Sequence, residues 1–226
     1  MFTKHQLERL LFFDIETSGK HQGYSEFYQT DDEGSDIWDK KSNRLKKDTP
    51  IDFYESEVSL FPEFGQIVCL SYGTIKDGTM QISTIKNEGD TLEMMKKIHV
   101  LFSKAEINGL KPTGWNIKNF DVPWVNRQCL MNGIPVPMIL STFDKKPWEV
   151  NVLDLKEVWK SGSTLDVTFE EAAYAMGIPS PKDDIDGSQV HENYHAGNLE
   201  RIVTYCEKDV KTMILMCEKL SKIYEN

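Results

Sequence analysis

One apolar stretch, Leu10–Gly19, constrains the fold of this chain more than any other part of its 226 residues. Four apolar residues begin the stretch and turn-forming residues close it, which is typical of a central strand buried on both faces. Two carboxylates, Asp14 and Glu16, interrupt its second half. Because side chains alternate along a strand, we expect both carboxylates on one face and Ile15 on the other.

Two carboxylates this close repel each other, and burying them without compensation costs free energy. A cation is therefore expected beside Asp14 and Glu16, and oxygen ligands favour a hard divalent ion such as Mg²⁺ or Mn²⁺. The alternative is a strand end that runs into a solvated loop, where acidic residues are common. The rest of the chain has to distinguish these two interpretations.

The composition is that of a globular protein with a substantial core, with 39% hydrophobic and 11% aromatic residues. The four cysteines form no CxxC pair, and each stands among apolar residues. We expect reduced core cysteines, without a zinc site or disulfide framework. The N-terminus lacks a signal-peptide pattern, and no stretch approaches the ~20 apolar residues of a membrane span. These features predict a cytoplasmic protein without membrane contact.

The formal net charge of −10 argues against a strongly basic nucleic-acid-binding surface. A metal-dependent nuclease partly escapes this objection, because its acidic site is neutralised by ions that then receive the phosphate. The charge therefore predicts weak binding to long duplexes, and it leaves nucleic-acid chemistry open.

Strand-like and helix-like segments alternate in the second part of the chain. Segments 66–73 and 80–85 are strand-like, and Asp77-Gly78 between them is a strong hairpin signal. A further short strand is expected over 150–155. Helices are expected to begin at four capping or first-turn residues: Asp90, Pro123, Thr168 and Asn198. This order predicts a single α/β domain over residues 1–226, with a mixed central β-sheet and helices on both faces.

The segment at about 20–57 is the least regular part of the chain, and we expect a long irregular insertion there. It contains a cluster of acidic residues followed by a basic run, Lys40, Lys41, Arg44, Lys46 and Lys47. The basic run could contact a phosphate backbone. The ordinary interpretation of so short a charge run is a solvated loop.

Further carboxylates stand at two distant positions. Asp121 lies just before an expected helix start, where an Asp ordinarily serves as the N-cap. Tyr205 and Asp209 are four residues apart and so share one face of the last expected helix. Asp209 projects at the edge of the apolar stripe of that helix, between Ile202 and Met213, where a bare carboxylate is costly. It is expected to face an ion or a polar cleft.

These segments together resemble the three motifs of the DEDDy 3′→5′ exonucleases: Phe13-Asp14-Ile15-Glu16-Thr17, residues 116–121 and Tyr205-Cys206-Glu207-Lys208-Asp209. The chain as a whole is similar to stand-alone relatives of the proofreading exonuclease domain of family B DNA polymerases. Two further segments fit that subgroup: residues 62–68, which lead into the second expected strand, and the loop over residues 181–188. The similarity covers nearly all of the chain except segment 20–57.

The resemblance implies a ribonuclease H-like fold and two divalent ions, Mg²⁺ or Mn²⁺, held by Asp14, Glu16, Asp121 and Asp209. In such a site one ion activates water and the other stabilises the leaving 3′ oxygen. Asp14 is expected to bridge both ions, and Asp121 to hold the second one. Glu16 and Asp209 are expected to complete the site that binds the nucleophilic water. Tyr205 is expected to orient this water and to help deprotonate it.

By the same resemblance, Thr17 and Asn116 are placed to touch the terminal nucleotide, while Ile15 and Phe120 pack either beside it or in the core. The expected substrate is the 3′ end of single-stranded DNA, with a replication or repair protein as a candidate partner. One alternative is the same chemistry on RNA, which depends on how the pocket treats the 2′-hydroxyl. Another is a catalytically idle scaffold in a replication complex.

Residues 191–195, His-Glu-Asn-Tyr-His, spell the HExxH pattern of zinc peptidases. That chemistry needs both histidines on one face of a sustained helix, together with a third ligand. Gly187 and Gly197 flank the pattern and leave barely two turns. We therefore expect a surface turn with two solvated histidines in place of a zinc site.

Overall fold

A computed structural model describes residues 3–180 and 184–224, so residues 181–183 of the 181–188 loop lie outside the described part. Five strands form one sheet in the order β3-β2-β1-β4-β5. The first three strands, β1 (Leu10–Gly19), β2 (Gly65–Lys76) and β3 (Thr79–Lys86), pair antiparallel. The last two, β4 (Lys111–Gly114) and β5 (Leu153–Asp154), run parallel to β1. The sheet is mixed and β1 is its central strand, as predicted.

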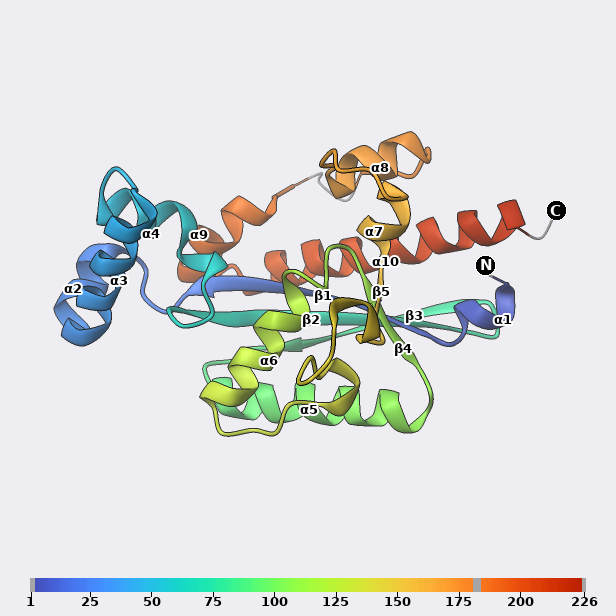
Figure 1. The fold of residues 1–226 in the computed structure, drawn as a ribbon, viewed down its shortest axis with the longest axis horizontal. Coiled ribbons are helices and arrows are strands. Elements are labelled where there is room, and N and C mark those ends of the chain that lie inside the picture. The colour runs from blue at the N-terminus through green and yellow to red at the C-terminus, as the bar shows by residue number, and fades with distance from the viewer. Residues whose placement is uncertain (1–2, 181–183, 225–226) are drawn as a thin grey trace.

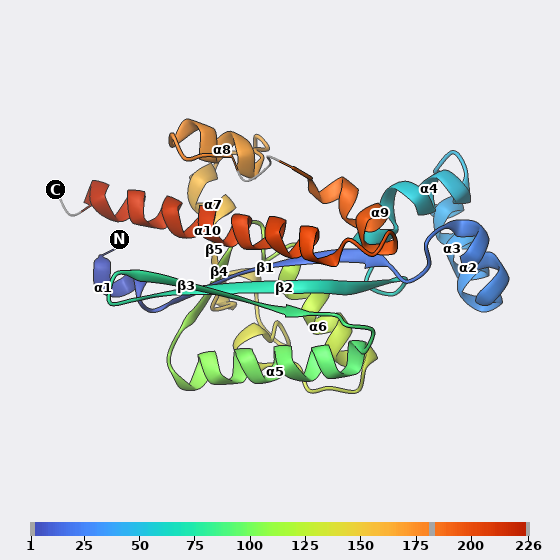
Figure 2. The same ribbon diagram turned by 180° about the vertical axis from the view of Figure 1, so that it is seen from behind.

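Helices cover both faces of this sheet (Figures 1 and 2). One face carries α5 (Thr91–Ile107) and α6 (Asp121–Met131). The other face carries α10 (Leu199–Tyr224), with α9 (Val190–His195) near its N-terminal end. On the side of α10 also lie α7 (Leu155–Lys160) and α8 (Phe169–Ala175), and the short α1 (Lys4–Leu7) precedes the sheet. The α/β class with helices on both faces is thereby confirmed.

Side-chain alternation along β1 divides the core into two parts. Phe13 and Ile15 pack in the cluster that α5 and α6 cover, and the Phe13 ring meets the Phe102 ring edge-on at 5.0 Å. Phe12 faces the opposite side and packs with Met213 of α10. The even-numbered residues of β1 therefore point toward α10, so the strand pattern alone orients the two carboxylates of β1 toward that helix.

Local signals set most element boundaries. The Asp77-Gly78 turn has positive φ at both residues, as the hairpin signal predicts. Asp90 caps α5 by accepting from the backbone N–H of Glu93 at 2.9 Å, and Thr168 forms a capping box at α8. The strand expected over 150–155 is shorter than predicted, since β5 contains only Leu153 and Asp154.

Segment 20–57 is helical, so the prediction of an irregular insertion was wrong. It contains α2 (Tyr24–Thr30), α3 (Asp32–Leu45) and α4 (Pro50–Glu57), which we call the α2–α4 unit. The side chain of Asp31 caps α3 and that of Thr49 caps α4. The unit projects beyond one end of β1 and β2 (Figure 1). A separate buried apolar cluster is formed by Phe27, Trp38, Phe53 and Tyr54 of this unit, together with Val58 just after α4.

All four cysteines are buried and free, as expected. Within the described ranges, none of the helices combines the length and apolar character that crossing a bilayer requires.

Candidate active site

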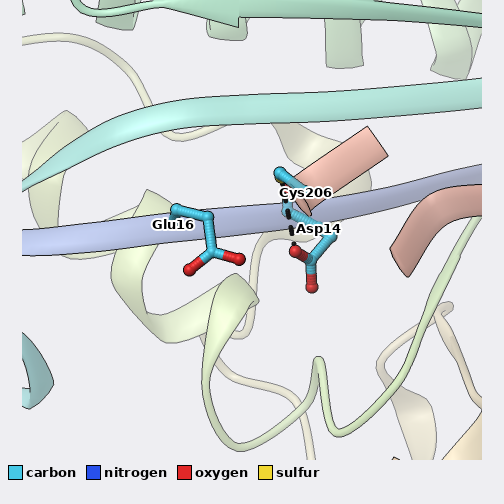
Figure 3. A group of neighbouring side chains, drawn as sticks. All are labelled: Asp14, Glu16 and Cys206. Carbon is cyan, nitrogen blue, oxygen red and sulfur yellow. Dashed lines mark hydrogen bonds between the residues drawn. The ribbon is translucent and has the colours of Figure 1, made fainter. Parts of the chain in front are cut away.

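The side chains of Asp14 and Glu16 leave β1 on the same side (Figure 3). One carboxylate oxygen from each of them and the Cys206 sulfur lie within 4.8 Å of one another. Glu16 is buried, whereas Asp14 keeps part of its surface exposed. The ladder between β1 and β2 shifts its register between Glu16 and Thr17, directly beside this pair. Such irregularities often occur next to active sites, because they re-aim a side chain.

Asp121 reaches the same region from the start of α6. The helix begins at Asp121 itself, and Phe120 occupies the capping position without a side-chain hydrogen bond. The N-cap interpretation of Asp121 is therefore wrong. One of its oxygens, Oδ1, instead accepts a 3.0 Å hydrogen bond from the backbone N–H of Ile15 in β1. The carboxylate is 2% exposed, so the fold holds it inside the protein.

The last helix supplies Tyr205 and Asp209, both of which are buried. Helix α10, which carries Asp209, packs against β1, and the charge of Asp209 is among the causes that raise the pKa of Asp14, Glu16 and Asp121. Asp209 also acts on Tyr205, one helical turn away. The structure thus brings together the four carboxylates and the tyrosine that the sequence singled out.

The carboxylates favour a protonated state when no cation is present. Burial raises the pKa of Asp14 and Glu16 well above the usual range, and the neighbouring carboxylates raise it further. Burial raises the pKa of Asp121 to about 7, although the Ile15 N–H opposes the shift. None of the described lysines or arginines forms an ion pair with Asp14, Glu16 or Asp121. The donor set and this uncompensated repulsion fit a hard divalent cation.

Cys206 is a site residue that sequence reasoning assigned only to the core. Its Sγ lies 3.3 Å from Asp14 Oδ2, and this hydrogen bond lowers the pKa of the Asp14 carboxyl (Figure 3). Burial, and then the neighbouring Cys69, raise the pKa of the Cys206 thiol, so the thiol remains a donor. The sequence could have indicated this role, because Cys206 lies between Tyr205 and Asp209. It also belongs to the apolar stripe of the helix, so it was assigned to the core.

Tyr205 has a phenol that resists ionisation. Burial raises its pKa above the usual value, and the charges of Asp209, Glu16 and Asp14 raise it further. The hydroxyl therefore stays protonated, which suits hydrogen bonding to a water molecule better than proton abstraction.

Asp154, at the end of β5, is a second residue that the sequence analysis missed. Its buried carboxylate accepts backbone N–H bonds from Asn116 at 2.9 Å and from Lys118 at 3.1 Å. It also caps α7 by accepting from Lys156 at 3.0 Å. Asn116 has a φ of 60°, so the loop that leads to Asp121 needs such support. The sequence feature that could have indicated Asp154 is an Asp placed between a short strand and a helix.

The four expected substrate-binding residues differ in their surroundings. Thr17 is buried and donates its hydroxyl to the Ser59 carbonyl at 2.7 Å, and Ile15 packs in the core. Asn116 and Phe120 keep partly exposed side chains, and Asn116 lines an open groove beside Asp154. Contact of these residues with a terminal nucleotide stays a prediction, and the surroundings favour Asn116 and Phe120.

The histidines of the HExxH pattern are partly buried on α9, so the expectation of two solvated histidines was wrong. The backbone N–H of Gly19 donates to His191 Nδ1 at 3.1 Å, and His191 Nε2 lies 3.1 Å from the Gln22 carbonyl. His195 Nε2 lies 3.1 Å from the Gly19 carbonyl. Both rings therefore contact the backbone of Gly19, the last residue of β1. Among the described residues they join no cluster of possible metal ligands.

The fold and the buried acidic cluster define an α/β domain of the polymerase-exonuclease class. A family described as "Predicted 3'-5' exonuclease related to the exonuclease domain of PolB" matches residues 59–223. The chain belongs to this family.

A solved structure supports the fold. The family B DNA polymerase of the hyperthermophilic archaeon Pyrobaculum calidifontis superposes with a TM-score of 0.58 and 17% sequence identity. The match covers 93% of this chain and 24% of the polymerase chain, so this chain spans about a quarter of that protein. No curated protein matches the sequence.

Proposed function

We propose that the chain is a metal-dependent 3′→5′ exonuclease that removes nucleoside monophosphates from the 3′ end of single-stranded DNA. The observation that carries the proposal is the convergence of Asp14, Glu16, Asp121 and Asp209 from β1, α6 and α10. Their mutual repulsion opposes folding in the absence of cations. A catalytically idle scaffold would have no use for such a cluster, which favours the enzyme over that alternative.

Two Mg²⁺ or Mn²⁺ ions bound by these four carboxylates would supply Lewis acidity for the attacking water and for the leaving 3′ oxygen. Asp14, the partly exposed member, would be the most accessible of the four residues that hold the ions. The Cys206 thiol donates to the Asp14 carboxyl and so favours its ionised form, against the larger effect of burial. The protonated Tyr205 hydroxyl is suited to orient the water. Asp154 holds the loop that precedes Asp121.

The preference for DNA rests on the polymerase-exonuclease relationship of the family. The RNA alternative shares the same carboxylates, and only the pocket around the terminal sugar would differ. A direct comparison of the two substrates is therefore part of the test.

The test uses 5′-labelled single strands of DNA and RNA with matched sequence, incubated with Mg²⁺ or Mn²⁺. Controls contain EDTA or the Asp14→Ala variant. We expect a ladder that shortens from the 3′ end, depends on metal and is absent in Asp14→Ala, with DNA as the faster substrate. Strands that stay intact under every metal condition would overturn the enzyme proposal, and faster RNA cleavage would overturn the DNA preference.

The Tyr205→Phe variant tests whether the Tyr205 hydroxyl orients the attacking water or removes its proton. We expect it to slow turnover by about 10-fold, much less than Asp14→Ala does. A complete loss of activity would contradict the orienting role. A rate equal to that of the unmodified protein would remove Tyr205 from the mechanism.

A further inference from the structure

An open groove of about 720 Å³ lies between the α2–α4 unit and α6. We call it the α3–α6 groove. Helix α3 contributes Lys40, Lys41 and Arg44 to its lining, and α6 contributes Arg127. These four cations face two carboxylates, Asp31 and Glu63, so the groove is a basic patch on a chain with a net charge of −10. The remaining lining residues are Gly34, Ile37 and Phe64.

The cations of the groove are exposed to an anionic ligand, although Lys40 pairs with Asp36 on the surface of α3, where both side chains are exposed. Arg127 pairs with Glu63 at 3.2 Å, but both side chains are about half exposed, and such a pair exchanges readily with solvent and ligands. Lys41 lies 4.0 Å from the centre of the Phe61 ring, and neither Lys41 nor Arg44 forms an ion pair with a described residue. The Asp31 carboxylate already accepts from the N-terminus of α3.

The groove adjoins the proposed active site through two elements. Phe64 accepts a backbone hydrogen bond from Lys20, which is four residues beyond Glu16 and so roughly 14 Å from it along an extended chain. Arg127 is six residues beyond Asp121, which is about 9 Å along α6. A nucleic-acid strand carries one phosphate per roughly 3.4 Å or more. The groove therefore lies at most about four nucleotides from the carboxylates.

We propose that the α3–α6 groove binds the phosphate backbone of the single-stranded DNA substrate a few nucleotides from its 3′ end. This inference rests on the proposed exonuclease function and assigns a substrate-binding role to helix α3. The family match begins at residue 59, so the α3 wall of the groove lies outside the matched region, whereas Glu63, Phe64 and Arg127 lie within it. Basic grooves with an aromatic surface, here Phe64, are typical of binding to single strands without sequence preference.

The test compares two charge-reversed double variants. Arg44→Glu/Arg127→Glu removes one cation from each wall of the groove. Lys97→Glu/Lys104→Glu is the matched control, because it makes the same charge change on exposed residues of α5 that line a separate groove beside Tyr72. Thermal unfolding of both variants establishes that they are folded.

Binding is measured in EDTA, where the strand stays intact, by fluorescence anisotropy of labelled single-stranded DNA. The strand has about 20 nucleotides, longer than common single-strand sites. We expect the groove variant to bind roughly tenfold more weakly than the unmodified protein at low salt. We also expect the slope of log Kd against log salt to fall by about 1.4, or about 0.7 per lost phosphate contact. The control should bind like the unmodified protein, and equal losses in both variants would overturn the groove assignment.

Hydrolysis distinguishes failure of this inference from failure of the exonuclease proposal. With Mn²⁺, the groove variant should raise KM for the long strand and leave hydrolysis of p-nitrophenyl thymidine monophosphate unchanged, because this small substrate cannot reach the groove. An equal effect on both substrates would overturn the inference. If the unmodified protein hydrolyses neither substrate, the exonuclease proposal fails, and the anisotropy result still decides whether the groove binds DNA. Tighter binding of poly-glutamate than of DNA would indicate an acidic protein partner and overturn the DNA assignment.

Discussion

The backbone N–H of Ile15 donates a 3.0 Å hydrogen bond to Oδ1 of Asp121, which is 106 residues away in the sequence. The pairing of β1 with β4 ends at Phe12 and Thr113, so Ile15 has no partner on β4. Asp121 replaces that missing partner. The bond satisfies a buried backbone N–H of the central strand that has no partner on β4 and, by doing so, fixes a carboxylate of the proposed metal site.

Asp121→Asn and Asp121→Ala separate these two roles. The amide keeps an oxygen that can accept from Ile15, whereas Ala leaves a buried N–H without a partner. We expect the Asn variant to exceed the Ala variant in free energy of unfolding by about 1–3 kcal/mol, measured with urea. We expect both to lose most of the metal-dependent hydrolysis. Full activity in Asp121→Asn would remove the residue from the metal site.

Metal-free stability should fall as pH rises. The raised pKa values of Asp14, Glu16 and Asp121 mean that the folded chain binds more protons than the unfolded chain. The window extends from the ordinary carboxyl pKa of about 4 up to about 7 for Asp121. The contribution of these groups to stability is therefore present below this window and is lost as pH rises through it. Thermal unfolding in EDTA, followed across this range, measures the decline.

Mn²⁺ should raise the Tm of the unmodified protein more at about pH 8 than at about pH 5, because protons compete with the ion for the same carboxylates. Asp14→Asn should be more stable than the unmodified protein in EDTA at the higher pH and should respond little to Mn²⁺. An undiminished metal response in Asp14→Asn would show that the ion binds elsewhere.

Asp154→Ala should destabilise the chain and impair catalysis indirectly, because Asp154 supports the loop that precedes Asp121. It leaves the N–H groups of Asn116 and Lys118 without their acceptor. We expect a loss of roughly 2–3 kcal/mol of stability and a fall in kcat through displacement of Asp121. Asp154→Asn should restore part of both, since it keeps one acceptor oxygen. Normal turnover in a destabilised Asp154→Ala protein would limit the residue to a structural role.

Cys206→Ala should weaken metal binding. The thiol lowers the pKa of Asp14, so its removal favours the protonated carboxyl, which cannot bind the ion. We expect the Mn²⁺ concentration for half-maximal activity to rise about 10-fold, in the range seen for residues that support metal ligands. Cys206→Ser should lie between Ala and the unmodified protein. Identical metal titrations in all three proteins would contradict the role of the thiol.

His191 should make stability decline at mildly acidic pH. Burial, and then the neighbouring His195, lower its pKa, so the unfolded chain takes up the proton first, near the usual pKa of about 6.5. The contribution of His191 is complete above that value and is lost as pH falls below it. His191→Asn keeps an acceptor for the Gly19 N–H without titrating, and its stability should vary less with pH. Equal pH profiles would exclude His191 as the source.

The parts of this fold that could be predicted are those determined by residues close together in the sequence. The pattern of β1, the Asp77-Gly78 hairpin and the helix caps act locally, and the motif resemblance supplied the carboxylates. The α2–α4 unit was missed because its cluster unites residues from separate short helices. For example, the rings of Trp38 and Phe53 stack at 4.4 Å. This contact joins two separate helices, so it produces no hydrophobic periodicity within any single segment of the sequence.

The supporting residues of the site were missed for a similar reason. Asp154 matters because Asn116 adopts a left-handed conformation 38 residues earlier, and the sequence gives no sign of that conformation. Cys206 looked like one more apolar residue on its helix until its sulfur was found beside Asp14.

The origin of the four carboxylates in β1, α6 and α10 has a consequence for the nascent protein. During synthesis the first two motifs emerge long before Asp209, and α10 must dock on the sheet before all four carboxylates meet. A partly made or partly folded chain therefore holds scattered acidic residues with no capacity to cut nucleic acid. The proposed nuclease would therefore be complete only when α10 has docked on the sheet, and its cleavage rate would report that docking.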